Sequence, residues 1–529
     1  MYGLESFFST KDWAIVIAYL ACTISLGWWY SRRARGNGLT LESVPWPVVA
    51  ASLAVSELTA WLVLALPGAM LAIHGDLAFL SWILVALVVR LMIGVLLIRR
   101  GWSLQREPRE TSEDEAEPRV CQLLGGLGSL GALLSQGLRL VVLALPLLVL
   151  TGWRIEVCLL VVWFLAMMLR FTGSFRAVVR GDWVHFLALF AALGAVCCFL
   201  GKETGGTWEA AVDQLRESEN FAGEVRDKLR FLDFRFDPAR AFTLWTALLA
   251  LPLLQFQLLT LDRTHLHRLR LCASPRAAGM AVIASGIAVS AALLILLISG
   301  LALFLIYRHD PPTDPGILKA LAWSAGEPRR VELAIPVWIL TELPDGLRGL
   351  LFAGLFASGF TAMHASLLVS PSCPPRGDAI LGARRSILSS FLWRLVLLFL
   401  ALAMGRYLGG SGEGLLSIGY GIATYTVGPM VGLSVLAARG VDGVRPIGAG
   451  IGVAASLCLV FLLRGELIWL LRDVGSIGEG LEQIPWLPRV DEATGEIRQN
   501  LSYVWLWPFT ALLTWVCGWK KRQSGSSES

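Results

Sequence analysis

The hydrophobic pattern of this chain consists of long apolar runs separated by polar, mostly basic loops. Many runs approach or exceed the ~20 residues that an α-helix needs to cross ~30 Å of hydrocarbon. A soluble protein of this length would alternate apolar and polar faces instead. The pattern therefore predicts an all-α polytopic membrane protein with about 13 transmembrane helices. The predicted spans are residues 12–30, 46–73, 77–98, 122–150, 152–171, 182–201, 240–260, 277–307, 347–371, 386–408, 413–438, 446–464 and 501–519.

Basic residues, mostly arginine, follow every odd-numbered predicted span. Examples are Arg32 after the first span, Arg99 after the third, Arg176 after the fifth, Arg268 after the seventh and Lys520 after the last. Lys and Arg in short loops are retained on the cytoplasmic side of a membrane. The pattern predicts a multi-pass protein of the plasma (inner) membrane, with its N-terminus outside and its C-terminus in the cytoplasm.

Composition narrows the class further. The 529 residues are 55% hydrophobic and 16% charged, and the net charge of +5 does not indicate nucleic-acid binding because the basic residues lie at loop edges. The nine cysteines include no CxxC pair, so we expect small buried side chains rather than metal ligands. No HExxH motif or Ser-His arrangement indicates an enzyme, and no organic cofactor is expected. The expected partners are a small-molecule solute and the lipid bilayer; the pattern carries no signal for an oligomeric state.

Polar side chains interrupt the second predicted span. Ser56, Glu57 and Thr59 lie in an otherwise apolar stretch. A carboxylate in the bilayer centre is costly, so it needs a partner or a water-filled cavity. Broken helices of transporters place such a side chain and freed carbonyls at the midplane, where ion and solute bind. The alternative is that Glu57 lies near the interface or is capped by a neighbouring span.

Four segments resemble, in order and spacing, the sodium/solute symporter family, and most nearly its sodium/proline symporter branch. They are SELTAWLVLALPGAM (56–70), GSFRAVVRGDWVHF (173–186), LDRTHLHRLRLCASPRAAGMA (261–281) and ELPDGLRGLLFAGLFASGF (342–360). The resemblance runs from about residue 10 to about residue 460.

The resemblance implies a five-plus-five inverted-repeat transporter fold that works by alternating access around a midplane site. Spans 2–6 (residues 46–201) would form the first repeat and spans 7–11 (residues 240–438) the second. Residues 1–45 would be a peripheral span and loop, residues 202–239 an extracytoplasmic loop, and residues 439–529 two peripheral spans with a short tail.

The same resemblance implies a sodium site. Backbone carbonyls of Val55, Leu58 and Ser358 would contribute oxygen ligands, together with the hydroxyl of Thr361. Ala362 stands where the family has a second hydroxyl, which removes one ligand from a hard cation that prefers several oxygens.

Two further residues carry candidate coupling chemistry. Asp182 matches an aspartate near the cytoplasmic ion exit of the family, although it would also serve as an N-cap at the start of the sixth span. His364 has an unperturbed pKa near ~6.5 and can change charge at physiological pH, or it can remain a neutral hydrogen-bond partner.

The seventh span supplies candidate solute contacts. Gln255 and Leu259 stand where proline transporters of the family carry aromatic residues, so the pocket is expected to differ from theirs. Gln255 and Gln257 would hydrogen-bond a solute, or alternatively satisfy backbone groups freed by Pro252.

Two arginines, Arg90 and Arg139, fall near mid-membrane and need counter-charges. Glu57 is the candidate partner for one of them. An arginine facing the cavity would clamp a carboxylate bidentately, and snorkelling to the interface is the remaining alternative. The predicted solute-binding set is therefore Ser56, Glu57, Thr59, Arg139, Gln255 and Leu259.

These features predict a secondary active transporter that couples a small polar organic solute, an amino acid or a carboxylate, to an ion. Sodium is the first expectation for that ion. One alternative is coupling to protons through Glu57, Asp182 or His364. Another is a solute sensor on the same fold that does not transport.

Overall fold

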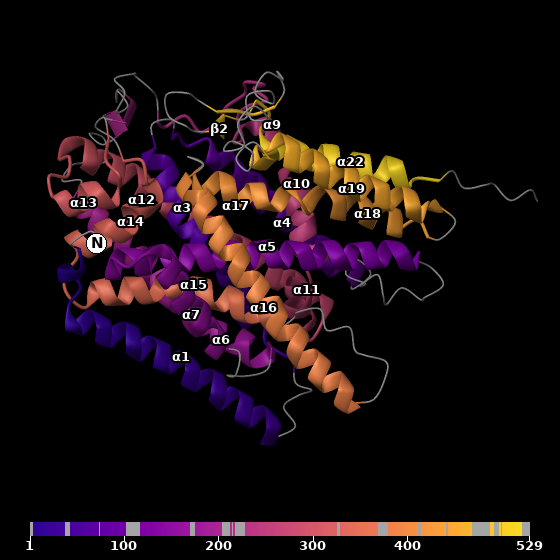
Figure 1. Ribbon diagram of the computed structural model, residues 1–529, viewed down its shortest axis with the longest axis horizontal. Coiled ribbons are helices and arrows are strands. Elements are labelled where there is room, and N and C mark those ends of the chain that lie inside the picture. The colour runs from indigo at the N-terminus through magenta and orange to yellow at the C-terminus, as the bar shows by residue number, and fades with distance from the viewer. Residues whose placement is uncertain are drawn as a thin grey trace, which may run out of the picture.

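The computed structural model is a helical bundle in which the first helix lies along one edge and the last helices form the opposite corner (Figure 1). Two short strands, β1 (Arg489–Val490) and β2 (Ile497–Arg498), pair antiparallel outside the bundle. The structure describes residues 4–36, 43–72, 75–101, 117–169, 175–203, 212–213, 215–216, 228–324, 328–368, 379–410, 414–440, 443–467, 487–490, 497–498 and 500–520.

Each predicted span coincides with one helix or with a short series of helices. Seven described helices are long and apolar enough to cross a membrane, or eight if one bent pair counts as a span; the count of thirteen stays a prediction. The helices are α1 (Thr10–Gly36), α2 (Trp46–Glu57), α3 (Ala60–Leu71), α4 (Phe79–Arg100), α5 (Pro118–Thr151), α6 (Ile155–Leu169), α7 (Phe175–Glu203), α9 (Leu244–Leu249), α10 (Leu251–Phe256), the π-helix η4 (Gln257–Leu261), α11 (Arg263–Arg270), α12 (Pro275–His309), α13 (Pro315–Ala320), η5 (Val331–Leu333), α14 (Ala334–Glu342), α15 (Leu347–Leu368), α16 (Ala379–Gly410), α17 (Leu415–Thr424), α18 (Val427–Ala437), α19 (Pro446–Leu463), η7 (Tyr503–Trp505) and α22 (Leu506–Gly518).

The second span is broken between α2 and α3, which meet at a bend of 55°. Leu58 has ψ 55° and Thr59 has ψ 152°, so neither residue continues the α-helix. The Ser56 hydroxyl donates to the Leu53 carbonyl at 2.8 Å, a local bond that competes with helical pairing. Among the backbone hydrogen bonds of the described residues, none is accepted by the carbonyls of Val55 and Leu58. The break thus exposes two backbone acceptors inside the bundle.

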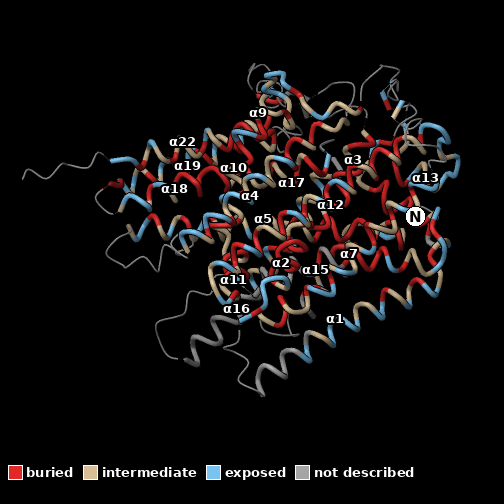
Figure 2. The backbone as a smooth tube through the Cα atoms, turned by 180° about the vertical axis from the view of Figure 1, so that it is seen from behind, coloured by how far each residue is buried: buried red, intermediate tan, exposed pale blue. Residues whose placement is uncertain are grey.

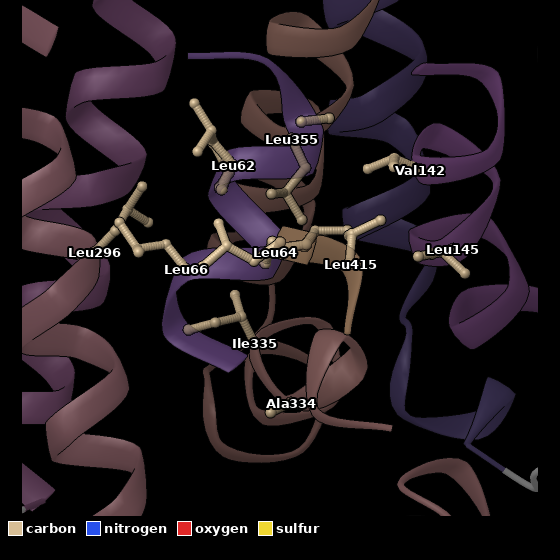
Figure 3. Packing of buried hydrophobic residues seen from close by; sticks show 14 of the residues in the cluster. Leu62, Leu64, Leu66, Val142, Leu145, Leu296, Ala334, Ile335, Leu355 and Leu415 are labelled. Atoms are coloured by element: carbon tan, nitrogen blue, oxygen red, sulfur yellow. The ribbon is translucent and has the colours of Figure 1, made fainter. Parts of the chain in front are cut away.

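Helix α3, the second half of the broken span, lies at the centre of the main hydrophobic core. Figure 3 shows Leu62, Leu64 and Leu66 of α3 surrounded by side chains of other helices. Those neighbours come from α5, α12, α14, α15 and α17. The half-helix is therefore held by packing on nearly every side, and its bend is fixed by the bundle.

Close helix packing depends on small residues. A Cβ on Gly300 of α12 would lie 2.6 Å from the Pro67 carbonyl oxygen and 2.6 Å from the Met70 Cβ of α3. A Cβ on Gly279 of α12 would likewise lie 2.6 Å from the carbonyl oxygen of Gly94 in α4. Such close approach is typical of membrane helices, which associate through van der Waals contact because the hydrophobic effect does not drive helices together within lipid.

Large apolar side chains also face outward. Buried residues fill the interior and exposed ones gather at the periphery (Figure 2). Among the exposed side chains are Ile447 (71%), Phe399 (69%) and Ile17 (61%). An apolar exterior of this kind suits contact with lipid, in agreement with a protein that crosses the membrane many times.

Helix α1 is tied to α15 by a buried carboxylate. Asp12 of α1 is fully buried, and its Oδ1 accepts from the backbone amides of Gly346 at 2.7 Å and Gly349 at 2.9 Å. These bonds cap the N-terminus of α15, which also has a favourable dipole for an anion. The cap fixes the start of α15 relative to the rest of the bundle.

Replacing Gly349 by alanine is expected to destabilise the protein, because the added Cβ would lie 2.6 Å from the Asp12 carbonyl oxygen. Overpacking of this kind costs about 1–3 kcal/mol. The matched control is Gly194→Ala in α7, where nothing lies within 4 Å of the new Cβ. Thermal unfolding in detergent should show a lower Tm for Gly349→Ala only; equal melting of the two variants would contradict the α1–α15 contact.

Candidate transport site

A cavity of about 300 Å³ opens at the break of the second span. Its wall is formed by residues of α2, α3, α4, α5, α10, η4, α11, α12, α16, α17 and α18. The π-helical turn η4 contributes Gln257 and Leu261; single π turns of this type occur often at functional sites. The cavity therefore joins two irregular helix segments, one in each predicted repeat.

A buried ion pair lies in the cavity wall. Arg90 Nη2 donates to Glu57 Oε2, and the two side chains are 2% and 7% exposed. Arg90 Nε also donates to Gln255 Oε1 at 2.9 Å. Each partner neutralises the other, so the high cost of a lone charge inside the membrane is avoided. Arg90 thereby links α4 to the break in the second span and to α10.

A second polar pair, Asp262 and His265, lies directly after η4. Asp262 caps α11 by accepting from the amides of Thr264 at 2.9 Å and His265 at 3.0 Å, and its Oδ1 lies 3.0 Å from His265 Nδ1. Burial alone would raise the pKa of Asp262, but the hydrogen bonds and charge of His265 and the charge of Arg139 lower that pKa to about 2. Burial lowers the pKa of His265. Near neutral pH, Asp262 is ionised and His265 is uncharged.

Aromatic side chains also line the cavity. Trp82 and Tyr420 meet edge to face at 5.3 Å between ring centroids, and Trp61 and Tyr420 do so at 5.2 Å. Phe79 stacks on Trp82 at 6.1 Å. The indole of Trp82 donates to Thr246 Oγ1 at 3.2 Å, which fixes its orientation. The cavity thus combines an apolar aromatic part with a charged part.

A second buried polar cluster, formed by Ser52, Asp182 and Arg268, lies beside the cavity. The Ser52 hydroxyl donates to Asp182 Oδ2 and accepts from Arg268 Nε at 2.9 Å. Arg268 Nη2 lies 4.0 Å from Asp182 Oδ2. The interpretation of Asp182 as an N-cap is wrong, because α7 begins at Phe175 and Asp182 lies two turns inside it. Asp182 instead connects α7 to α2 and α11.

Five of the six predicted solute-binding residues line the cavity, and the sixth does not. The five are Ser56, Glu57, Thr59, Arg139 and Gln255. Leu259 is fully buried in a separate apolar cluster with residues such as Val49 and Leu269.

The structure shows which arginine pairs with Glu57, where Arg139 lies and what the two glutamines contact. Glu57 pairs with Arg90, and Arg139 lines the cavity. Gln255 is held by Arg90, whereas the Gln257 amide lies 3.7 Å from the Met430 sulfur.

The predicted sodium ligands are described only in part. The carbonyls of Val55 and Leu58 lie at the break, and α15, which packs against α2 and α3, carries the other predicted ligands. The side chains of Ser358, Thr361, Ala362 and His364 lie outside the part of the chain that the structure describes. The sodium site stays a prediction, although carbonyl oxygens released by a helix break are suitable ligands for it.

Sequence reasoning missed the roles of His265, Trp82 and Tyr420. A signal for His265 existed, since Asp262 and His265 are spaced i, i+3 at a helix start and such residues meet on one face. The aromatic group carried no signal in sequence, because Trp82 and Tyr420 are brought together only by the folding of distant spans.

Comparison with known proteins agrees with this fold. The solved structure of a Na⁺-coupled sialic acid symporter, in a substrate-bound outward-open state, is similar over 97% of each chain with a TM-score of 0.69 and 16% sequence identity. The solved structure of a manganese transporter of Eremococcus coleocola is similar over 90% of this chain and 98% of the transporter's chain, with a TM-score of 0.44 and 15% sequence identity. The likeness to the sialic acid symporter confirms the all-α, five-plus-five transporter fold.

The family follows from sequence. The model of the sodium:solute symporter family matches residues 39–374, and the chain belongs to this family of transporters. No curated protein matches the chain in sequence. Placement next to the sodium/proline branch stays a prediction.

The Glu57–Arg90 pair provides a stability test. Arg90→Met should lower the free energy of unfolding by about 3–5 kcal/mol, because it leaves a buried carboxylate without its counter-charge. The double variant Glu57→Gln/Arg90→Met should recover part of that loss. Unfolding of the purified single and double variants in detergent checks this as a double-mutant cycle. Strictly additive effects would show that the two side chains do not interact.

Proposed function

We propose that this protein is a secondary active transporter that couples the movement of a small polar organic solute, an amino acid or a carboxylate, to sodium. The solute would bind in the cavity at the break between α2 and α3 and be released by alternating access. The observation that carries the proposal is the meeting, at one cavity, of this break with the irregular segment α10–η4.

The placement of the two irregular segments supports alternating access. The break at Leu58 lies within the first span of the first predicted repeat (residues 46–201). The π turn η4 lies at the end of the first span of the second predicted repeat (residues 240–438). Inverted-repeat transporters bind their substrates between such discontinuous helices.

The charges of the cavity wall support a solute with a carboxylate. Its described lining residues include four arginines, Arg90, Arg139, Arg263 and Arg268, against two carboxylates, Glu57 and Asp262. Because Glu57 is already paired with Arg90 and Arg268 lies beside Asp182, the remaining lining charges are Arg139 and Arg263 against Asp262, a positive balance. Guanidinium groups bind carboxylates with good geometry, and the aromatic part of the wall would pack against an apolar portion of the solute.

Membership of the family and the released carbonyls of Val55 and Leu58 support sodium as the coupling ion. Hard cations prefer oxygen ligands, and backbone carbonyls provide them without an added charge.

Uptake into proteoliposomes tests the proposal. A panel of labelled amino acids and carboxylates is supplied under an inward sodium gradient and, separately, under a proton gradient with no sodium. Accumulation driven by sodium is the expected result. Accumulation driven by protons alone would favour the proton-coupled alternative, and no accumulation by folded protein under either gradient would contradict transport of these solutes.

Thr361→Ala is expected to abolish the sodium dependence of uptake, since this substitution would remove the remaining hydroxyl ligand of the predicted site. The control is Thr341→Ala in α14, whose hydroxyl donates to the Val337 carbonyl at 3.1 Å. Uptake is measured against sodium concentration for both variants. Unchanged sodium activation in Thr361→Ala would remove this residue from the ion site.

A further inference from the structure

Several buried polar atoms at the cavity have no hydrogen-bond partner among the described residues. Four of them are Glu57 Oε1, Thr59 Oγ1, Arg90 Nη1 and His265 Nε2. All four residues line the same cavity. Buried polar groups are rarely left without partners, so this concentration of unsatisfied atoms points to a ligand with polar groups of its own.

The hydrogen-bonding character of these atoms can be assigned. Glu57 Oε2 is occupied by Arg90, so Oε1 is the carboxylate oxygen that remains available. Asp262 can only accept, so His265 Nδ1 donates to it. In the neutral ring the other nitrogen, Nε2, is then an acceptor. His265 Nε2 and Glu57 Oε1 are therefore two acceptors, and they face each other at 3.7 Å.

We propose that His265 Nε2 and Glu57 Oε1 form a subsite for a protonated amine of the solute. A single ammonium nitrogen can donate to both atoms at ~2.9 Å, since it carries several N–H groups. Thr59 Oγ1 provides a further acceptor at the same wall. Arg90 Nη1 is a donor and would accommodate the carboxylate of the same solute. The subsite thus selects an α-amino acid over a plain carboxylate.

Charges of both signs surround the subsite, and its two acceptors belong to the negative or neutral groups. The groups around His265 are Glu57 from α2, Arg90 from α4, Arg139 from α5, and Asp262 and Arg268 beside it in the chain. A sodium ion fits this position less well, because it prefers oxygen ligands to an imidazole nitrogen. The proposal rests on solute transport or binding at this cavity and adds the amine as the recognised group.

Matched ligand pairs test the subsite on the unmodified protein. The pairs are alanine with propanoate, leucine with 4-methylpentanoate, and phenylalanine with 3-phenylpropanoate. Binding is read from the shift in Tm of the purified protein in sodium buffer, and uptake is measured in proteoliposomes. For at least one pair, the amino acid should bind about 10- to 100-fold more tightly, as expected for hydrogen bonds that involve a charged group.

The variant His265→Phe should reduce that discrimination, since it keeps an aromatic ring but removes the acceptor. The matched control is His267→Phe, two residues away on the same short helix, where the side chain is exposed. The control should keep the wild-type ratio. The readout is the ratio of the affinities for the two ligands of a pair, rather than total activity. A general loss of stability therefore does not imitate the result.

Each outcome has a defined meaning. Discrimination in the wild type that falls in His265→Phe supports the subsite. Equal binding of the paired ligands, or binding of none of the amino acids, overturns it. Discrimination by Tm shift without any uptake would retain the subsite and contradict the proposed transport.

Discussion

The ion pair between Glu57 and Arg90 is the interaction on which the centre of this structure depends. It places a carboxylate at the break of the second span, where a lone charge would be unfavourable, and neutralises it with a guanidinium from α4. Arg90 also binds Gln255 at 2.9 Å, so one side chain connects three helices around the cavity. The packing of α3 then holds the bent half-helix in place.

This arrangement explains how an apolar bundle can contain a polar cavity. The wall has a charged part, built on Glu57, Arg90, Asp262 and His265, and an aromatic part that includes Trp82. The charged groups are mutually paired, and their buried atoms without a hydrogen-bond partner among the described residues are Glu57 Oε1, Arg90 Nη1 and His265 Nε2. A solute with both polar and apolar portions fits such a wall, because each portion meets a surface of the matching kind.

Membrane spans follow from hydrophobic length, and the five-plus-five arrangement was predicted from the resemblance to a known family. The sequence also predicted Glu57, Thr59 and Arg139, since polar residues in apolar spans are conspicuous. The sequence did not predict that Leu259 packs into a separate apolar cluster, because the π turn changes the direction in which the side chains after Gln257 point. The spacing of Asp262 and His265 indicates their pairing, but the approach of His265 to Glu57 depends on α11 packing against α2, which spacing does not encode.

The joint flux of solute and ion tests the central claim most directly. Entry of radiolabelled sodium into proteoliposomes is measured with and without an amino acid that the protein takes up, at zero membrane potential. If transport is coupled, the amino acid accelerates sodium entry in a fixed ratio to its own uptake, and Arg90→Met abolishes both fluxes together. Sodium entry that is unaffected by the solute would contradict coupled transport through this cavity.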